Sequence, residues 1–551
     1  MALLMDDARV DAVTLGDALL RAARDRPDHP AIAMPEGTWS YGELAARATR
    51  IARNLIGMGV RPGDHVGVLM PNGFDILAAY FGVSLAGATI VPVNARFRAR
   101  EMGYIVENAD LVCLITNDAN DDYVNYLDLV IDSIGGLGDA PDAHALAVRH
   151  APRLRSLVVL GRREREGVLD EAAFDALGED VAEAAVHRRR LGVSLGQPAL
   201  VLYTSGTTAE PRGAIISHES VVRVWHNGVG RALRLTPEDR VWNPCPMFHI
   251  AAFGVSIACV AIGATIVTAR FYEPDESIDL LIRERPTALY PAYANILLGI
   301  LNHSRFGEVD MAAATRVLVV GPPRTLRDLQ DRVGPGCVLV STFGMTESCG
   351  CSTQHDLDDP VEVRTGTVGL PVPGLEARIA DPMTDAEVGP DERGEIQLRG
   401  PLLFGGYHRD AAKTAATFLP GGWMRTGDLG SADASGRIRY LGRIKEIIRV
   451  GGENLSPAEI EAHVMTHPAV QIAQAVGIPD QRLDEVPVVF VELRAGASAT
   501  EEEILEHCRG AIARFKVPRH VRFVTEWPMS ATKVQKFKLR ETMMAELGLS
   551  E

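Results

Sequence analysis

The sequence predicts an α/β protein with a large N-terminal body of several subdomains and a small, mobile α+β lid domain at its C-terminus. Over the first 440 residues, short β-branched runs alternate with longer helical patterns, which is typical of parallel-rich sheets flanked by helices. After about residue 441 the pattern changes, and short strands enclose a few helices. The length of 551 residues accommodates such a division, because a domain averages roughly 150 residues.

The clearest βαβ unit lies near the N-terminus. Val66–Met70 is predicted as a strand, Phe74–Leu85 as an apolar helix and Ala88–Val93 as the next strand. Two strands joined by one helix form a parallel unit, whose crossover is right-handed. The same alternation returns at 240–269 and 316–341, so we expect further strands of this kind there.

One uncharged stretch, Ile250–Ala269, is long enough to cross a membrane. Gly254, Gly263 and Thr265 interrupt it, and Ala264–Val267 has the β-branched character of a separate strand. We therefore expect a buried helix followed by a strand, and no membrane span.

Two charged stretches are predicted to lie on the surface. Residues 117–150 are polar and acidic and contain Gly135 and Gly136, which indicates an irregular segment. His187–Arg190 is the strongest basic run, and such short runs are typical of a solvated helix face.

The predicted lid domain, residues 447–551, is joined to the body, residues 1–441, by a hinge at 442–446. Pockets often lie where two domains meet, so we expect the site there. The elements predicted in the lid are strands at Val470–Gly477 and Val486–Leu493 and helices at Pro457–Val464 and Thr500–Phe515.

Charge and cysteine content exclude several classes of protein. The net charge of −16 argues against a nucleic-acid partner, because phosphate-binding surfaces concentrate lysine and arginine. Seven cysteines in a chain of this length indicate no disulfide framework. The first seven residues, Met1–Asp7, lack a cationic leader, so we expect a cytoplasmic protein.

A hydroxyl-rich segment at 203–213 follows the predicted strand Ala199–Leu202. It combines several hydroxyls, two glycines and one cation, Arg212, so donors and close backbone approach are available to an anion. It does not have the G-x-x-x-x-G-K-[ST] pattern, so that mechanism does not carry over. Taken alone, the segment also fits a polar surface turn.

Further motifs follow this segment in a fixed order: Pro246–His249, Ser341–Glu347, Gly394–Tyr407, Trp423–Asp428, Gly442–Lys445 and Gly451–Pro457. Together they resemble the signatures of the adenylate-forming superfamily, which includes acyl-CoA synthetases, stand-alone adenylation domains and firefly-type luciferases. The overall similarity is to bacterial fatty-acyl-CoA ligases. The resemblance covers nearly the whole chain.

The resemblance implies a binding site for ATP and Mg²⁺. Phe343 would stack on adenine, Asp428 would accept both ribose hydroxyls, and Arg443 would reach the ribose or a phosphate. Thr204 and Glu347 would hold Mg²⁺, which prefers oxygen ligands. The residues implied around the phosphates and the rest of the nucleotide are Thr204, Ser205, Gly206, Thr207, Thr208, Arg212, Gly321, Pro322, Gly344, Met345 and Thr346.

The resemblance also implies a thiol site and an acyl pocket. Lys445 would be the pivot of the lid, while Gly451, Gly452 and Glu453 would belong to the loop that passes the pantetheine arm of coenzyme A. His249 would gate the pocket, although a histidine in an apolar stretch also fits a core position. The residues implied in the acyl pocket are His249, Phe253, Gly254, Ala292 and Val320.

Lysine is scarce, since only six of the 56 basic residues are lysine. Arg212 stands where the family usually has lysine, and a guanidinium also binds phosphate. Lys533 lies in a segment, Pro528–Lys536, similar to the family's C-terminal lysine motif, where the ammonium bridges the substrate carboxylate and the α-phosphate. A solvated basic tail with Lys536 and Lys538 is the alternative. We expect Lys533, His249 and Glu347 to act in catalysis.

Three departures from the family pattern bear on activity. Ala209 replaces a loop glycine, the glycine usually found before Lys533 is absent, and Val320–Arg324 replaces a segment of smaller residues. A displacement of about 1 Å near the chemistry can cost roughly a hundredfold in rate.

These motifs predict an ATP-dependent carboxylic acid:CoA ligase that acts through an acyl-adenylate and releases AMP and pyrophosphate. One alternative is transfer of the acyl group to the phosphopantetheine of a carrier protein. Another is a nucleotide-binding paralogue without turnover. We expect the acid to be small, with a medium-chain, cyclic or aromatic body.

Overall fold

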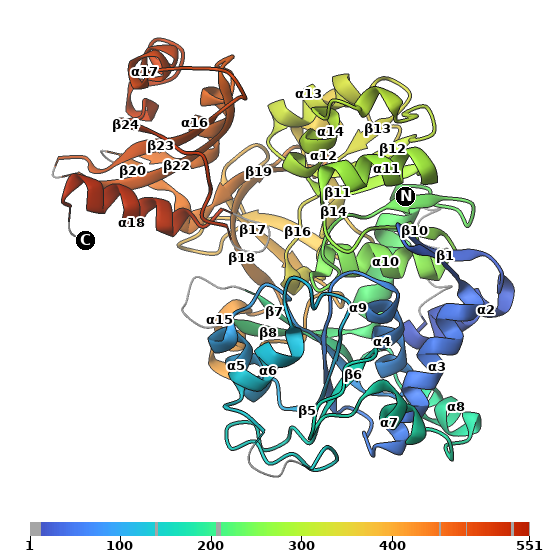
Figure 1. Ribbon diagram of the computed structural model, residues 1–551. Coiled ribbons are helices and arrows are strands. Elements are labelled where there is room, and N and C mark those ends of the chain that lie inside the picture. The colour runs from blue at the N-terminus through green and yellow to red at the C-terminus, as the bar shows by residue number, and fades with distance from the viewer. Residues whose placement is uncertain are drawn as a thin grey trace. The chain divides into compact units, whose positions relative to one another are not determined.

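The computed structural model describes residues 13–137, 142–204, 211–450, 453–480, 482–529 and 534–549, and it confirms the predicted α/β fold class (Figure 1). The chain divides into two compact units. The first comprises Met1–Gly321, Leu326–Glu376 and Arg399–Trp423, and the second comprises Pro322–Thr325, Ala377–Leu398 and Met424–Glu551. These units begin and end at other residues than the predicted domains, 1–441 and 447–551, whose boundary at 442–446 stays a prediction.

One sheet of the first unit, the N-terminal sheet, contains the predicted βαβ unit. Strands β3 (His65–Leu69) and β4 (Thr89–Pro92) pair in parallel and are joined by α4 (Phe74–Leu85). The strand order is β6-β5-β3-β4-β7-β8, and only the β7–β8 pair of this order is antiparallel. The other strands are β5 (Leu111–Asn117), β6 (Ser156–Leu160), β7 (Pro198–Thr204) and β8 (Arg212–Ser217).

Helices cover both faces of the N-terminal sheet (Figure 1). The pair α3 and α4 lies on one face, and α5 and α6 lie on the other, where their apolar side chains share a core with β5. The helices around this sheet are α3 (Tyr41–Gly57), α5 (Ala99–Asn108), α6 (Tyr126–Ser133), α7 (Glu171–Ala176), α8 (Glu183–Leu191) and α9 (His218–Val222).

A second sheet of the first unit, the central sheet, has the order β13-β12-β11-β9-β10-β1-β2. Its pairs are parallel except for the hairpin of β1 and β2. The strands are β1 (Pro30–Met34), β2 (Gly37–Ser40), β9 (Arg240–Trp242), β10 (Thr265–Val267), β11 (Ala288–Tyr293), β12 (Arg316–Val320) and β13 (Val338–Val340).

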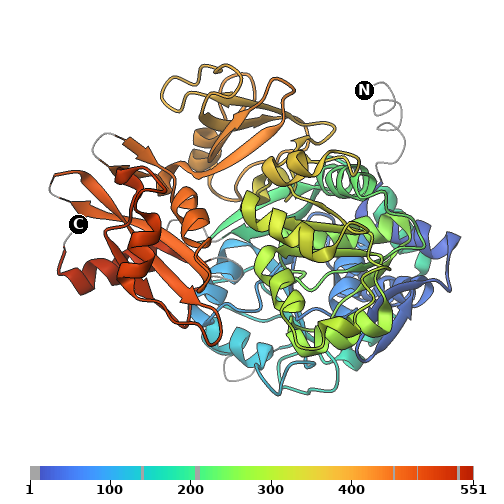
Figure 2. The same ribbon diagram turned by 90° about the horizontal axis from the view of Figure 1, so that it is seen from above.

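Helices α11 (Pro274–Glu284), α12 (Ala294–Leu301) and α13 (Pro323–Val333) lie together near the central sheet (Figure 2). Their apolar side chains share one core cluster with Trp242, Leu289 and Val317 of the sheet. Periodic apolar positions on each helix, such as Leu326 and Leu329 of α13, therefore account for the packing.

The uncharged stretch at Ile250–Ala269 forms a helix and a strand, as predicted. Helix α10 (Ile250–Ile262) ends at Gly263, whose φ of +90° favours glycine, and β10 follows. Nearly all side chains of α10 are buried inside the first unit. Among the described helices, none combines the length and the apolar character that a membrane crossing requires.

Two of the predicted segments differ from the structure. Residues 117–150, predicted as irregular, contain helix α6, because Leu127, Val130 and Ile131 recur at helical spacing and are buried. The helix predicted at Thr500–Phe515 is shorter, since α17 (Glu501–Cys508) ends before Gly510, which has a φ of +75°. The seven cysteines are free and buried.

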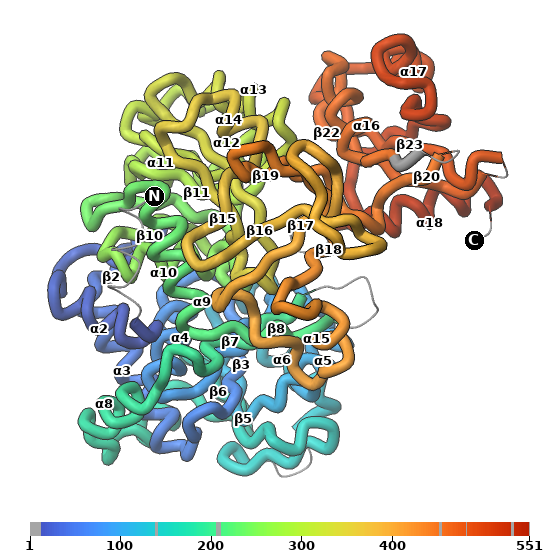
Figure 3. The backbone as a smooth tube through the Cα atoms, turned by 180° about the vertical axis from the view of Figure 1, so that it is seen from behind, coloured from blue at the N-terminus to red at the C-terminus, as the bar shows by residue number. Residues whose placement is uncertain are grey.

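The second unit contains two further sheets. The β16–β19 sheet consists of β16 (Glu376–Ala380), β17 (Gly394–Arg399), β18 (Met424–Ala432) and β19 (Ile438–Arg443), and its β17–β18 and β18–β19 pairs are antiparallel (Figure 3). The C-terminal sheet consists of β20 (Ile448–Val450), β21 (Glu453–Leu455), β22 (Val470–Asp480), β23 (Asp484–Leu493) and β24 (His520–Phe523).

Both faces of the C-terminal sheet are covered by helices that follow its strands in the chain (Figure 1). On one face, α16 (Pro457–Val464) and α17 pack against Ala473 and Val489. On the other face, α18 (Lys536–Leu547) packs against Val488 and Phe490. This part of the chain therefore has a hydrophobic core of its own.

A buried histidine joins two helices of the first unit. His218 begins α9 and is 2% exposed, and its Nδ1 accepts a hydrogen bond of 3.3 Å from the backbone N–H of Leu15. Leu15 begins α2 (Leu15–Asp25), so this bond satisfies a free donor at a helix start. Burial lowers the pKa of His218 to about 4, although the carboxylate of Asp17 opposes the shift.

We expect His218 to make the stability of the protein depend on pH. Its folded pKa lies below the unfolded value near 6.5, so its contribution is complete above that pH and is lost as the pH falls toward 4. The loss should reach about 3 kcal/mol, from roughly 1.4 kcal/mol for each pKa unit. Urea unfolding of wild type and His218→Asn at pH 7, 6, 5 and 4 measures this loss as the difference between the two proteins.

The difference in unfolding free energy should favour wild type at pH 7 and shrink steadily toward pH 4, since asparagine keeps the acceptor but does not titrate. His150→Asn, at an exposed position, is the matched control for the loss of an imidazole. A pH-independent difference for His218→Asn would show that this imidazole is not the titrating group.

Candidate active site

The predicted phosphate loop lies in the chain between the two paired strands of a β-hairpin. Thr204 ends β7 and Arg212 begins β8, and the two residues face each other in the antiparallel register. The side chain of Arg212 is one quarter exposed, and its Nε lies 3.4 Å from Oδ2 of Asp410. A strand pair thus places one hydroxyl and one guanidinium at the two ends of the loop.

The hairpin connects to the predicted magnesium ligand Glu347 through a third segment. Residues Gly405 to His408 run beside β8, because Gly405 and His408 donate backbone hydrogen bonds to Ile215 and Gly213. From this segment, the hydroxyl of Tyr407 donates a hydrogen bond of 2.6 Å to Oε1 of Glu347. The structure therefore brings Glu347 close to the strand that carries Arg212.

The surroundings of Glu347 hold its carboxylate in place. The residue is 8% exposed, lies in a single 3₁₀ turn (Thr346–Ser348), and accepts a backbone hydrogen bond from Phe404. Burial, together with the neighbouring carboxylate, raises the pKa of Tyr407, so this hydroxyl stays a donor. The second carboxylate oxygen, Oε2, is not used by Tyr407.

The predicted adenine-stacking residue, Phe343, is anchored by a threonine of the following strand. Its backbone N–H donates a hydrogen bond of 3.0 Å to Oγ1 of Thr353, and this hydroxyl donates one of 2.5 Å to the carbonyl of Val368. Phe343 is 7% exposed. Hydrogen bonds through Thr353 and Val368 therefore fix the backbone that bears the Phe343 ring.

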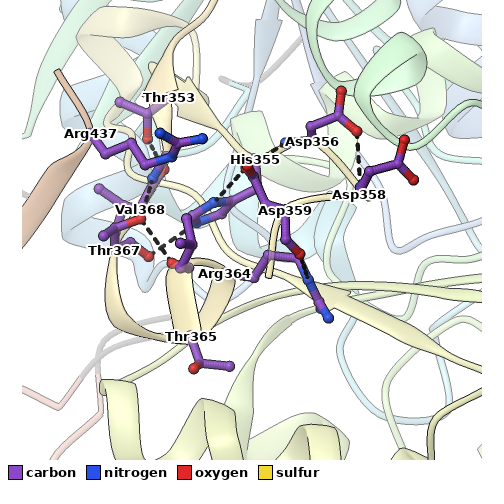
Figure 4. Close-up of polar contacts among 12 residues, drawn as sticks. Thr353, His355, Asp356, Asp358, Asp359, Arg364, Thr365, Thr367, Val368 and Arg437 are labelled. Carbon is purple, nitrogen blue, oxygen red and sulfur yellow. Dashed lines mark hydrogen bonds and ion pairs between the residues drawn. The ribbon is translucent and has the colours of Figure 1, made fainter. Parts of the chain in front are cut away.

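The network continues to a buried histidine (Figure 4). Nε2 of His355 lies 3.1 Å from the carbonyl of Thr367, and Nδ1 lies 3.6 Å from Oδ2 of Asp359. Burial lowers the pKa of His355. These contacts tie the turn before Val368 to the strand of Thr353, so they support the adenine side of the site indirectly.

Glycine is required at Gly344, beside Phe343. A Cβ atom there would lie 2.2 Å from the backbone oxygen of Gly350, which has no room to move within its turn. The turn therefore folds back closely after Glu347. Met345 and Thr346, also predicted to contact the nucleotide, are half-buried in the same turn, and Gly321 and Pro322 are half-buried at the end of β12.

The predicted acyl-pocket residues come from three elements of the first unit. His249 is half-buried and precedes α10, and Phe253 and Gly254 lie on that helix. Ala292 is buried on β11 with a φ of +59°, and Val320 at the end of β12 is 40% exposed. The ring of Phe253 packs edge-to-face on Tyr80 at 5.2 Å, whereas Gly254 faces Trp225.

In the second unit, the predicted ribose ligands form an ion pair. Asp428 and Arg443 face each other on β18 and β19, and Nε of Arg443 lies 3.0 Å from Oδ1 of Asp428. The Asp428 side chain is 2% exposed and that of Arg443 is 30% exposed. Lys445, the predicted pivot, is exposed in the 3₁₀ turn Ile444–Glu446, and Glu453 pairs with Val450 through the backbone.

Several predicted site residues lie outside the described residues. For the phosphate loop these are Ser205, Gly206, Thr207, Thr208 and Ala209; for the thiol-site loop, Gly451 and Gly452; and for the lysine motif, Lys533. Their roles stay predictions. On either side of Lys533, Met529 and Val534 pair across an antiparallel bridge.

The sequence does not identify the residues that position the predicted site residues by contact. Tyr407 ends the motif Gly394–Tyr407, which implies no role for it, and Asp410, three residues later, has no signal beyond its charge. Trp225 and Thr353 lie outside the motifs. Contacts in the folded chain identify them. Trp225 contacts Cys349 and Asp410 contacts Arg212, and the two residues of each pair are more than 100 positions apart.

The described part of the first unit carries groups whose chemistry suits an anion and a hard cation. A guanidinium and a threonine hydroxyl bracket the phosphate loop, and Glu347 offers an anchored carboxylate nearby. Such a pairing of fixed donors with an oxygen ligand suits a triphosphate and its Mg²⁺ ion.

Family comparison supports the same reading over most of the chain. The family model described as AMP-binding enzyme matches residues 19–408, and the model described as AMP-binding enzyme C-terminal domain matches residues 459–533. The chain is 31% identical over 545 residues to the candidate acyl-CoA synthetase YngI of Bacillus subtilis (strain 168), covering 98% of each protein.

Two further relatives cover nearly the full length. Over 537 residues the chain is 31% identical to a Rhodococcus jostii (strain RHA1) ligase named for a bicyclic propanoyl:CoA product, covering 96% of this chain and 98% of that protein. Over 557 residues it is 29% identical to the mitochondrial medium-chain acyl-CoA ligase ACSF2 of Rattus norvegicus, covering 98% of this chain and 89% of that protein.

A solved structure has the same fold. The anthranilate CoA ligase AuaEII, in complex with anthranoyl-AMP, superposes with a TM-score of 0.84 and 25% identity over 98% of this chain and 99% of that one. The sequence motifs, the anchored Glu347 and these matches agree, and the chain belongs to the family of AMP-binding enzymes.

Proposed function

We propose that the protein is an ATP-dependent carboxylic acid:CoA ligase of the AMP-forming, acid–thiol class. The observation that carries the proposal is the end-to-end match to acyl-CoA synthetases and ligases. In the first step the acid carboxylate attacks the α-phosphate of ATP, which forms the acyl-adenylate and releases pyrophosphate. In the second step the CoA thiol attacks the acyl carbon, AMP leaves, and the thiol proton goes to solvent.

The electrostatic task of the first step explains the residues we assign to it. A carboxylate and a triphosphate repel each other, so fixed cations and donors must lower the barrier. We assign Arg212 and the loop that begins after Thr204 to the β- and γ-phosphates, and Lys533 to the carboxylate and the α-phosphate. A compact ammonium suits that last role, because it can follow charge as it moves between two oxygens.

We assign the nucleoside part to the residues that the resemblance implies. Phe343 stacks on adenine with Gly321, Pro322 and the turn after Gly344 around it. Asp428 accepts the ribose hydroxyls, and Arg443, its ion-pair partner, orients it. Gly451, Gly452 and Glu453 pass the pantetheine arm, and Lys445 is the pivot about which the lid turns between the two steps.

Mg²⁺ fits the oxygen ligands of the first unit. Thr204 and Glu347 would hold it together with ATP phosphate oxygens, and the ion would neutralise charge on the triphosphate. Tyr407 leaves Oε2 of Glu347 available, which supports this assignment.

The acceptor thiol and the acid follow from the relatives. Free CoA is the proposed acceptor, because the named relatives are CoA ligases. If only a carrier-protein phosphopantetheine were acylated, that part of the proposal would be wrong. The proposed acid has a medium-chain, cyclic or aromatic body and reaches the adenylate past His249. We infer a role in fatty acid and lipid metabolism, and the predicted cytoplasmic location stays part of this proposal.

Lys533→Ala should lower the rate of acid-dependent pyrophosphate release by about 100-fold or more, since one group that stabilises transition-state charge is lost. Pyrophosphate and AMP are measured with ATP, Mg²⁺ and CoA across a panel of carboxylic acids.

Lys538→Ala is the matched control, because Lys538 is exposed on α18 and the charge change is the same. It should retain wild-type rates. Absence of AMP with every acid would refute the ligase proposal, and equal rates for wild type and Lys533→Ala would refute the role of Lys533.

Tyr407→Phe should raise the Mg²⁺ concentration needed for half-maximal activity by about tenfold, because loss of a hydrogen bond to a metal-ligating carboxylate weakens metal affinity by roughly 10–100-fold. The KM for the acid should stay unchanged, since Tyr407 contacts Glu347 and not the acyl pocket. Mg²⁺ titrations at saturating ATP measure the effect.

Tyr123→Phe removes a hydroxyl from a side chain that is 80% exposed, and its Mg²⁺ titration should match wild type. If the curve of Tyr407→Phe also coincides with wild type, Tyr407 does not position a metal ligand.

A further inference from the structure

Trp225 contacts three segments, and two of them, α10 and β11, carry predicted acyl-pocket residues. It is on a π-helical turn (Arg223–Gly230) that continues α9. Its side chain is 1% exposed and is one of the largest fully buried side chains among the described residues. Such turns are rare and are frequent at functional sites. No motif of the family predicted a role for this residue.

The first segment is helix α10, which follows His249. A Cβ atom on Gly254 would lie 1.9 Å from Cε2 of the Trp225 indole, so the ring occupies the space that a side chain at 254 would fill. Any other residue at 254 would have to displace the ring. The indole therefore covers the face of α10 that Gly254 leaves open.

The second segment is the turn after Glu347. The indole Nε1 donates a hydrogen bond of 2.8 Å to the backbone oxygen of Cys349. A Cβ atom on Gly350 would lie 2.8 Å from Cζ2 of the same ring. Trp225 thus fills the space beside a second glycine and holds the backbone that leads from the proposed metal ligand.

The third segment is β11. The ring of Tyr290 contacts the indole edge-to-face, with centroids 6.1 Å apart, and Ala292 follows two residues later. Trp225 is therefore enclosed by two glycines and an aromatic ring, while its hydrogen bond fixes its orientation. Because protein interiors are closely packed, small side-chain movements would not displace an indole held in this way.

We propose that Trp225 closes the inner end of the acyl pocket and restricts the enzyme to acids with a compact acyl body. This inference rests on the proposed function. An acyl chain that enters past His249 along α10 meets the indole at Gly254, so chains long enough to reach that point are excluded. The small neighbours of the indole mean that a smaller residue at 225 would leave a cavity in line with the acyl group.

The test uses the full-length enzyme and a panel of acids of rising size: straight-chain acids from acetate to dodecanoate, and monocyclic and bicyclic carboxylic acids. The kcat/KM for each acid is measured by pyrophosphate release. Trp225→Ala should move the preferred size upward by about two to four methylenes, the space of an aromatic ring. For acids of that size kcat/KM should rise about tenfold or more, as expected for each added methylene that a pocket accepts.

Two further variants keep the test decisive if Trp225→Ala folds poorly. Trp225→Phe should give a smaller upward shift. Trp225→Ala combined with Gly254→Leu refills the space from the opposite side and should restore the wild-type size preference. Trp242 is an equally buried tryptophan in the core of the central sheet, so Trp242→Phe is the control, and it should leave the size profile unchanged.

A rise in the KM for ATP without a shift in the size profile would show that Trp225 acts only through the turn after Glu347, and would overturn the inference. Identical size profiles for wild type, Trp225→Phe and Trp225→Ala would overturn the inference and leave the ligase proposal standing. If wild type turns over no acid at all, the proposed function fails, and this inference fails with it.

Discussion

A carboxylate and a triphosphate repel each other, so the proposed chemistry depends on charges that are fixed before either substrate binds. Two contacts position such charges in the first unit. Asp410 pairs with the guanidinium of Arg212, and the hydroxyl of Tyr407 donates a hydrogen bond to the carboxylate of Glu347. Both partners come from one short stretch of chain, residues 405–410, whose first part runs beside β8. The cation and the proposed metal ligand are therefore positioned by the same piece of backbone, although Arg212 and Glu347 are 135 residues apart in sequence.

The choice of arginine at position 212 fits this arrangement. A guanidinium has a fixed plane and several donors, so Asp410 can hold one side of it while the other side stays available to phosphate. An ammonium would have no such division between its donors. The scarcity of lysine throughout the chain therefore need not weaken the phosphate site, whereas the proposed role of Lys533 requires the mobile ammonium that arginine cannot imitate.

Local patterns predicted most of the fold. Helix α4 and helix α16 have the predicted bounds, because apolar periodicity and flanking turn residues are both local. Predictions were wrong where one weak local signal stood alone: the acidic residues around α6 concealed its apolar face, and Gly510 ends the helix predicted through Phe515. The site was predicted only as far as motifs reached. Residues that act by contact with another segment, such as Tyr407, Asp410 and Trp225, have no local pattern, since each is defined by a partner far away in the sequence.

The C-terminal sheet is sandwiched between its own helices, with α16 and α17 on one face and α18 on the other. Its apolar side chains are thus shielded from water by residues of the same part of the chain. A rotation of such a part would expose little apolar surface to water, so its cost in hydrophobic free energy would be low. The turn of the lid proposed between the two reactions would therefore leave both clusters of this core intact.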